Sequence, residues 1–430
     1  MKLFVTVYEE TCDAAIDAIR ALPSEHDGVE VRAERFAEIG LDAIRAATAK
    51  PIILTYRGSR VPDVARALAS GIDFVDVEWH DGVRIQVPER TVISHHDYEG
   101  MRDVESIVER MHALRCAYTK LAATPQNFAD NRRLLGLLPR ASVIGMGERG
   151  LYSRILAPFL GSELTFVAAG NVAAPGQLTL QRALEIYGPS GTTGSQPVKV
   201  FAVVGNPAGH SLSPSIHNRL FREKGVPAAY TIASIERFDE ITSAFLRGEP
   251  CGLSVTAPFK DDAFAFALEH GAEIGENASR AKAVNTLVHL GDTIIADNTD
   301  VDGFSALLPR ARRAAVIGAG GTARAAVVAL EDAHIPATVY NRTVWKGDAP
   351  LDALRDFDGD LIINTLPSGI DVAIPPCETY IEAAYRSGAT GSQPVDGLRA
   401  RRSSHIGGLE LLRAQAVRQH QLFMKVFDGF

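Results

Sequence analysis

Lys120 is a residue of this sequence whose surroundings favour chemistry. It lies in the middle of the apolar, strand-like run AYTKLAAT, residues 117–124. Lysine is seldom fully buried without a partner, and burying its charge is costly. Two interpretations are open. Either the side chain extends along apolar surface and keeps its ammonium in water, or a neutral amine attacks a carbonyl.

Other polar residues occur at comparable places in similar apolar runs. Each lies within or just after one of these runs: Glu30, Arg32, Arg57, His96, Arg154 and Gln177. Glu30 and Arg32 are two residues apart and so share one face of a strand. Taken singly, His96 could be a capping residue, and Arg57 and Arg154 could be solvated surface charges. Their joint occurrence indicates one rim that gathers a lysine, a histidine and arginines.

These residue types indicate imine chemistry on a keto acid. A neutral lysine amine condenses with a ketone, and the protonated imine acidifies the neighbouring carbon. Nearby arginines and partial desolvation would favour the neutral amine. A histidine can remove the proton and later protonate a leaving hydroxyl, and an arginine fork suits a carboxylate. The inferred substrate is a small keto acid that loses water.

The elements that must position these residues form a regular series. Eight β-like runs alternate with Ala-rich helical segments, at residues 3–8, 29–34, 51–56, 74–79, 91–96, 117–122, 141–146 and 164–169. This alternation predicts an α/β fold that begins with a (β/α)8 barrel, in which the carboxyl ends of the strands hold the chemistry.

The motifs EVR, TYR, SHHDYEG, YTKLA, GMGERGLYSRI and APGQL resemble, in order, those of type I 3-dehydroquinate dehydratase over residues 1–180. The resemblance implies that Lys120 forms the imine, His96 is the general acid and base, and Glu30 assists the histidine. It also implies substrate binding by Arg32, Arg57, Arg154 and Gln177. The chain departs from many members in having Val61 and Ala173 where they have an acidic residue and a serine, and His95 replaces a common tyrosine.

A second group of residues begins at Val316, in VIGAGGTARAA. A strand-like run precedes these glycines and a helix-like run follows, which is the context of a dinucleotide fingerprint. The loop would hold a pyrophosphate at a helix N-terminus with residues Gly318, Ala319, Gly320, Gly321, Thr322 and Ala323. About twenty residues later the chain offers Asn341, Arg342, Thr343 and Lys346. An arginine there suits a 2′-phosphate, so we predict NADP.

Lys260 and Asp300 lie in motifs rich in serine, asparagine and threonine, which suit a pocket for a polyhydroxylated ring. Together they could be the acid/base pair of a carbonyl reduction. Lys260 could instead be a surface lysine after a turn, and Asp300 could form an Asx turn.

Residues 199–430 resemble shikimate dehydrogenase through GNPAGHSLSPSIHN, GLSVTAPFK, AKAVNTLV, ADNTDVDGF and GGLELLRAQAVRQHQLF. The resemblance implies a two-lobed α/β dehydrogenase with a Rossmann NADP domain, and Lys260 and Asp300 as its catalytic pair. It implies that the substrate contacts are Ser211, Ser213, Thr256, Asn285, Tyr385 and Gln415. Tyr385 is placed by YIEAAY, in the segment 365–408 that departs most from the family.

Four regions are expected: a barrel over 1–187, a linker over 188–198, a substrate-binding domain over 199–302 completed by a helix near 407–430, and a Rossmann domain over 303–406. The two activities would be consecutive steps of the shikimate pathway, in aromatic amino acid biosynthesis. The barrel would convert 3-dehydroquinate to 3-dehydroshikimate, and the second half would reduce that product to shikimate with NADPH. The fusion resembles bifunctional dehydratase–dehydrogenases.

Three alternatives stay open at this point. The barrel could be another imine-forming lyase, such as an aldolase, fused to a reductase. The C-terminal half could prefer quinate to shikimate. The chain could also be a non-catalytic quinate-pathway sensor, although Lys120, His96, Lys260 and Asp300 are all present.

Composition limits the remaining possibilities. The formal charge of −8 argues against a nucleic-acid partner. The four cysteines are far apart and indicate neither a disulfide framework nor a metal site. The N-terminus reaches two glutamates after one short apolar run, and no long uncharged apolar stretch occurs. We therefore expect a cytoplasmic enzyme that binds small molecules and no membrane.

Overall fold

The computed structural model describes residues 1–57, 63–189, 198–343, 346–367, 369–385 and 404–428. The chain divides into two compact units, Met1–Lys199 with Phe221–Ile235, and Val200–Leu220 with Glu236–Phe430. Most of the expected linker, residues 190–197, lies outside the described residues, and so does part of the segment 365–408. The boundaries of the four expected domains stay a prediction. The helices of the described ranges include none with the length and apolar character needed to span a bilayer.

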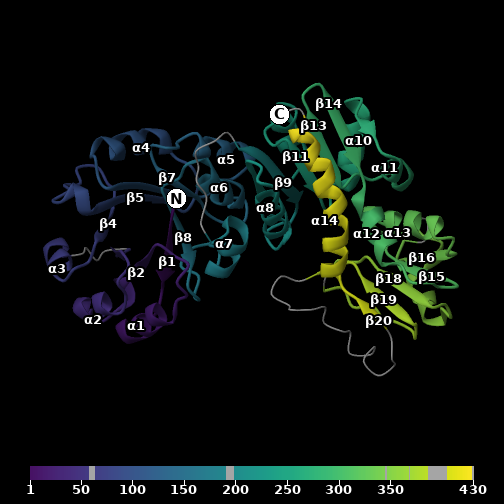
Figure 1. Ribbon diagram of the computed structural model, residues 1–430, viewed down its shortest axis with the longest axis horizontal. Coiled ribbons are helices and arrows are strands. Elements are labelled where there is room, and N and C mark those ends of the chain that lie inside the picture. Colours follow the sequence, from purple (N-terminus) through teal and green to yellow (C-terminus); the bar gives the residue numbers. More distant parts are fainter. Residues whose placement is uncertain (58–62, 190–197, 344–345, 368, 386–403, 429–430) are drawn as a thin grey trace. The chain divides into compact units, whose positions relative to one another are not determined.

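Eight parallel strands form the sheet of the first unit, in the order β7-β6-β5-β4-β3-β2-β1-β8 (Figure 1). They are β1 (Lys2–Val7), β2 (Gly28–Arg32), β3 (Ile52–Thr55), β4 (Phe74–Glu78), β5 (Thr91–Asp97), β6 (Tyr118–Ala123), β7 (Ser142–Gly145) and β8 (Leu164–Ala168). The two ends of this order meet where Ser142 Oγ accepts the backbone N–H of Leu164 at 2.9 Å. All eight predicted strands, and the barrel, are confirmed.

Seven helices accompany these strands in the first unit: α1 (Cys12–Ala21), α2 (Leu41–Ala46), α3 (Val64–Ala69), α4 (Val104–Ala113), α5 (Phe128–Leu135), α6 (Leu151–Leu156) and α7 (Leu180–Tyr187). Several begin where a side-chain oxygen accepts an early backbone N–H, as Thr11 does for α1 and Asn127 for α5. Their apolar faces cover the outer face of the strands, where Ile16 and Ile44 belong to one buried cluster with Val29 and Leu54.

The strand period of two decides where the polar residues lie. Phe4, Ile53, Val92 and Phe166 form a separate buried cluster, made of positions that alternate with those facing the helices. Two residues further along the strands, the same face carries polar side chains instead: Thr6, Thr55, Asp76, Ser94 and Lys120. The carboxyl ends of the strands therefore enclose a polar layer above an apolar one.

The second unit contains a sheet with the strand run β9-β11-β13-β14-β12. Their bounds are β9 (Lys199–Gly205), β11 (Gly252–Val255), β12 (Glu273–Ile274), β13 (Thr286–Leu290) and β14 (Thr293–Asp297). The nearby helices are α8 (Ser213–Lys224), α9 (Asp239–Phe245), α10 (Lys260–Glu269) and α11 (Glu276–Ala281), and β10 (Ala228–Ser234) falls in the segment counted with the first unit.

A parallel sheet in the order β17-β16-β15-β18-β19-β20 completes the second unit. Its strands are β15 (Ala314–Ile317), β16 (Ala337–Asn341), β17 (Ala349–Pro350), β18 (Leu361–Asn364), β19 (Thr379–Glu382) and β20 (Ser404–Ile406). The helices are α12 (Thr299–Leu307), α13 (Gly321–Asp332) and the long α14 (Gly408–Met424), yellow in Figure 1. The predicted strand, glycine turn and helix around residues 314–332 are confirmed.

Candidate active sites

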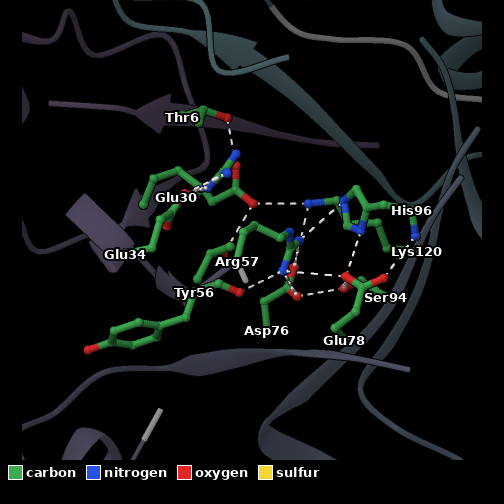
Figure 2. A network of polar contacts seen from close by, with 12 residues as sticks. Thr6, Glu30, Glu34, Tyr56, Arg57, Asp76, Glu78, Ser94, His96 and Lys120 are labelled. Carbon is green, nitrogen blue, oxygen red and sulfur yellow. Dashed lines mark hydrogen bonds and ion pairs between the residues drawn. The ribbon is translucent and has the colours of Figure 1, made fainter. Parts of the chain in front are cut away.

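Lys120 lies inside the barrel, on β6, with 4% of its surface exposed. Its Nζ is 2.9 Å from Glu30 Oε1 and 3.5 Å from Asp76 Oδ2, and 3.8 Å from the ring centre of Phe166 (Figure 2). The interpretation that its side chain reaches water is therefore wrong. The expectation that arginines are its nearest charges is also wrong, because two buried carboxylates hold the ammonium.

Glu30 is charged and faces the lysine. Its Oε2 accepts the Thr6 hydroxyl at 2.7 Å, and its Oε1 accepts Thr55 Oγ1 at 3.2 Å. Burial raises the pKa of Glu30, but the charges of Lys120 and Arg32 outweigh it and bring the pKa to about 2. The expected role of Glu30 as the partner of His96 is not what the structure has, because the strand β2 directs this carboxylate to Lys120.

His96, near the end of β5, is held by a different carboxylate. Its Nδ1 lies 2.7 Å from Glu78 Oε2, and its backbone N–H donates to Glu78 Oε1 at 2.9 Å. Its Nε2 lies 3.2 Å from Arg57 Nη2. Burial and the charge of Arg57 lower the pKa of His96, so the ring is neutral at neutral pH and can act as a base.

Arg57 forms a two-armed ion pair with Asp76. Its Nη1 and Nη2 lie 2.8 and 3.0 Å from the two carboxylate oxygens, and Ser94 Oγ donates to Asp76 Oδ1 at 2.6 Å. Burial raises the pKa of Asp76, but Arg57 and Lys120 together hold it far below its usual range. The expected substrate contact of Arg57 stays a prediction, since its guanidinium faces Asp76 and His96 in this structure.

A chain of hydrogen bonds joins Gln177 to the lysine. Gln177 Nε2 donates to Thr6 Oγ1 at 3.0 Å, and Thr6 in turn donates to Glu30. Gln177 Oε1 accepts the backbone N–H of Ala173 at 3.0 Å. The residues from β1, β2, β6 and the segment after β8 are thus brought together. Val61 lies outside the described residues.

The other two predicted arginines are arranged differently. Arg32 pairs with Glu34 at 2.6 Å. Arg154 is 5% exposed and its Nε donates to the Gly145 carbonyl at 2.8 Å, while burial lowers its pKa to about 10. Within the described residues no carboxylate pairs with Arg154, so its charge suits an incoming anion.

Sequence reasoning missed four residues of this network, namely Thr6, Asp76, Glu78 and Ser94. A signal was present, because DVE places Asp76 and Glu78 two apart on the inward face of β4, as SHH does for Ser94 and His96 on β5. A cavity of about 860 Å³ reaches Arg57, Asp76, Glu78 and His96.

The second site lies in the second unit, where α10 begins. Lys260 Nζ donates to Asp300 Oδ2 at 2.5 Å and to Thr322 Oγ1 at 2.8 Å, and Asn285 Nδ2 donates to Asp300 Oδ1 at 2.8 Å. The surface-lysine interpretation of Lys260 is therefore wrong, since its side chain is 12% exposed. Asp300 lies in the first turn of α12, and its backbone N–H bonds to Asn298.

A cavity of about 480 Å³ opens onto this pair. All eight side chains expected here line it: Ser211, Ser213, Thr256, Lys260, Asn285, Asp300, Tyr385 and Gln415. Gln415 Oε1 accepts Thr299 Oγ1 at 2.9 Å. Gly303 permits this approach, because a Cβ there would lie 2.9 Å from Gln415 Cβ.

An adjoining cavity of about 850 Å³ contains the glycine turn before α13. Gly318 has φ +103°, which only glycine adopts readily, and a Cβ on Gly320 would point into open space. The predicted residues that line it are Gly318, Ala319, Gly320, Gly321, Thr322, Ala323, Asn341, Thr343 and Lys346. Among the described residues, Arg342 is exposed and lies outside this lining.

Comparisons with known proteins agree with this division. Residues 3–193 match the family model of type I 3-dehydroquinase, and residues 203–287 match the shikimate dehydrogenase substrate binding domain. A pentafunctional AROM polypeptide of Lachancea thermotolerans is 31% identical over 79% of this chain and 24% of its own length. A chloroplastic bifunctional 3-dehydroquinate dehydratase/shikimate dehydrogenase of Arabidopsis thaliana is 28% identical over 72% of this chain.

The chain thus spans about a quarter of the fungal relative's length and 59% of the Arabidopsis one's. Among solved structures, a shikimate 5-dehydrogenase from Thermus thermophilus, in complex with NADP(H) and shikimate, is 26% identical. It covers 52% of this chain and 93% of its own, with a TM-score of 0.45.

Proposed function

Because residues 3–193 belong to the type I 3-dehydroquinase family, we propose that the barrel dehydrates 3-dehydroquinate to 3-dehydroshikimate through an imine on Lys120. The observation that carries the proposal is a buried lysine amine, 2.9 Å from a carboxylate that can receive its proton. A second supporting observation is the neutral histidine in the same network, because imine chemistry needs both a nucleophile and a base.

The residues divide the steps among them. Lys120 gives one proton to Glu30, and the amine attacks the ketone carbon; loss of water leaves a protonated imine. His96 Nε2 removes a proton from the neighbouring carbon, and the electron pair of that C–H bond moves toward the imine nitrogen. The β-hydroxyl then leaves as water with the proton from His96, and hydrolysis of the imine releases the product and the amine.

Arg154 is the residue that we assign to the substrate carboxylate. Its guanidinium is buried and has no carboxylate partner within the described residues, so an anionic substrate group would supply the missing charge. Arg32 and Gln177 are assigned to the hydroxyls, and Gln177 also connects the substrate side of the barrel to Glu30 through Thr6.

For the second site we propose reduction of 3-dehydroshikimate to shikimate, with NADPH as the hydride donor. The residues present fit a dinucleotide, since the N-terminus of α13, the open space beside Gly320 and the position of Lys346 suit a pyrophosphate and a 2′-phosphate. Lys260 would give a proton to the oxygen of the reduced carbonyl, and Asp300 would keep this lysine charged and oriented. Ser211, Ser213, Asn285 and Gln415 would hold the ring hydroxyls and carboxylate.

The two proposals are chemically continuous, because the product of the first is the substrate of the second. The test is to supply the full-length chain with 3-dehydroquinate and NADPH and to follow the products by mass spectrometry. We expect shikimate with NADPH and 3-dehydroshikimate alone without it. Aldol cleavage products, or an unchanged substrate, would overturn the proposal; parallel turnover of quinate would show which ring the second site prefers.

A further inference from the structure

We infer that Glu78 is the positioning residue that fixes the tautomer and orientation of His96, an inference that rests on the proposed dehydration. Glu78 is the last residue of β4, and β4 pairs in parallel with β5 so that Glu78 lies opposite Ser94. His96 is two residues further along β5 and therefore points to the same face. The strand register alone thus brings the carboxylate to the imidazole.

Both oxygens of Glu78 accept hydrogen bonds from this one residue. Oε2 lies 2.7 Å from His96 Nδ1, and Oε1 accepts the His96 backbone N–H at 2.9 Å. A carboxylate has only acceptor capacity, so Nδ1 must carry the proton. This two-point contact fixes the ring about its side-chain torsions as well as its tautomer.

The other ring nitrogen leads to the same assignment. Nε2 lies 3.2 Å from Arg57 Nη2, and a guanidinium can only donate. Nε2 is therefore an acceptor in this structure, which leaves its lone pair as the base. When His96 takes the substrate proton, the nearby charge of Glu78 stabilises the imidazolium.

The remaining carboxylates of the site are occupied elsewhere. Glu30 accepts from Lys120 and Thr6, and Asp76 accepts from Arg57 and Ser94. The titratable and charged groups that face His96 are Glu78 and Asp76 from β4, Arg57 after β3, Lys120 from β6, and the adjoining His95 and Tyr98. Within the described residues, Glu78 supplies the carboxylate that bonds His96.

The decisive variant is Glu78→Gln, because an amide has one acceptor oxygen where Glu78 uses two. If the amide oxygen accepts from Nδ1–H, the NH₂ group faces the backbone N–H of His96. If it turns over, the NH₂ group requires the other tautomer, and the Nε2 proton then faces Arg57. Either way a donor meets a donor, so the population of the Nδ1–H form must fall.

The test uses the full-length chain labelled with [¹⁵N]histidine, with the His96 signals assigned by their loss in His96→Asn. We expect the Nδ1–H tautomer in the wild type and a decrease in that form in Glu78→Gln. The kcat of dehydration should fall about 10- to 100-fold, within the range that general acid–base catalysis supplies, with little change in KM. The low-pH limb of kcat should move to lower pH, because the charge that favours the imidazolium is gone.

Two further variants separate positioning from folding. Glu78→Asp retains both acceptors and should recover part of the lost kcat, and Glu99→Gln, on the exposed loop after β5, should match the wild type. Borohydride trapping of the imine on Lys120 should survive in Glu78→Gln, because Lys120 is held by Glu30 and Asp76.

An unchanged tautomer with wild-type kcat in Glu78→Gln would overturn the inference, as would loss of imine trapping together with turnover. A wild type that traps no imine would instead overturn the proposed reaction, since the nuclear magnetic resonance measurement reads the tautomer without any turnover.

Discussion

Lys260 and Asp300 share a 2.5 Å hydrogen bond, although forty residues separate them in the chain. The bond joins the first residue of α10 to the first turn of α12, and Thr322 at the start of α13 accepts from the same ammonium at 2.8 Å. The proton donor of the proposed reduction therefore lies where the substrate cavity and the glycine turn adjoin.

Substitutions at this pair should separate the two activities. Lys260→Ala should lower the rate of 3-dehydroshikimate reduction about 10²- to 10⁴-fold, because it removes the group that protonates the forming alkoxide. Dehydration of 3-dehydroquinate, measured by product absorbance without NADPH, should stay at the wild-type rate. Wild-type reduction by Lys260→Ala would contradict the assignment, and the converse control is Lys120→Ala, which should retain reduction.

The pH dependence of dehydration follows from His96. Burial and Arg57 lower its pKa below the usual 6.5, and a base must be unprotonated to act. The kcat/KM of the free enzyme should therefore rise with pH through an apparent pKa below 6.5 and be level at pH 7. A limb that is still rising above pH 7 would be inconsistent with this environment.

The preference for NADPH should depend on Lys346 more than on Arg342. Lys346 lines the cavity beside the glycine turn, whereas Arg342 is exposed outside the lining. Loss of one contact to a phosphate worth about 1.4 kcal/mol corresponds to tenfold in affinity. Lys346→Ala should thus raise the KM for NADPH about tenfold and leave that for NADH unchanged. Equal effects on both cofactors would contradict a 2′-phosphate contact.

Asp76 should be important for the stability of the barrel. Its carboxylate is fully buried and holds both arms of Arg57, and removal of one partner of a buried ion pair costs about 3–5 kcal/mol. Asp76→Asn should therefore increase amide hydrogen exchange in β4 and β6, measured by mass spectrometry. Asp81→Asn is the matched control, because Asp81 is 83% exposed in its pair with Arg110, and exchange there should match the wild type.

The strands could be predicted because their signal is local. Runs such as PIILTY contain several consecutive apolar, β-branched residues, and every run of the barrel became a strand. The strands β14, β16 and β18 were not predicted. Thr293–Asp297, for example, follows β13 after a tight turn at Gly291 and pairs with it antiparallel, a relationship between two segments that no single window contains.

The residues of the sites were predictable by type but not by pairing. Lys120, His96 and Glu30 could be selected because each is a reactive group in a strand-like run. Their partners depend on which strands are neighbours and on their register, so the contact of Glu30 with Lys120, and of Glu78 with His96, required coordinates. The alternation in DVE shows that part of this information was present in the sequence.

The central claim is that the buried amine of Lys120 bonds covalently with the substrate ketone. The most direct measurement is reduction with sodium borohydride in the presence of 3-dehydroquinate, followed by mass mapping of the modified peptide. The account predicts a stable adduct on Lys120 that is absent from Lys120→Ala, together with loss of dehydration in that variant. An adduct on another lysine, or dehydration that persists in Lys120→Ala, would contradict it.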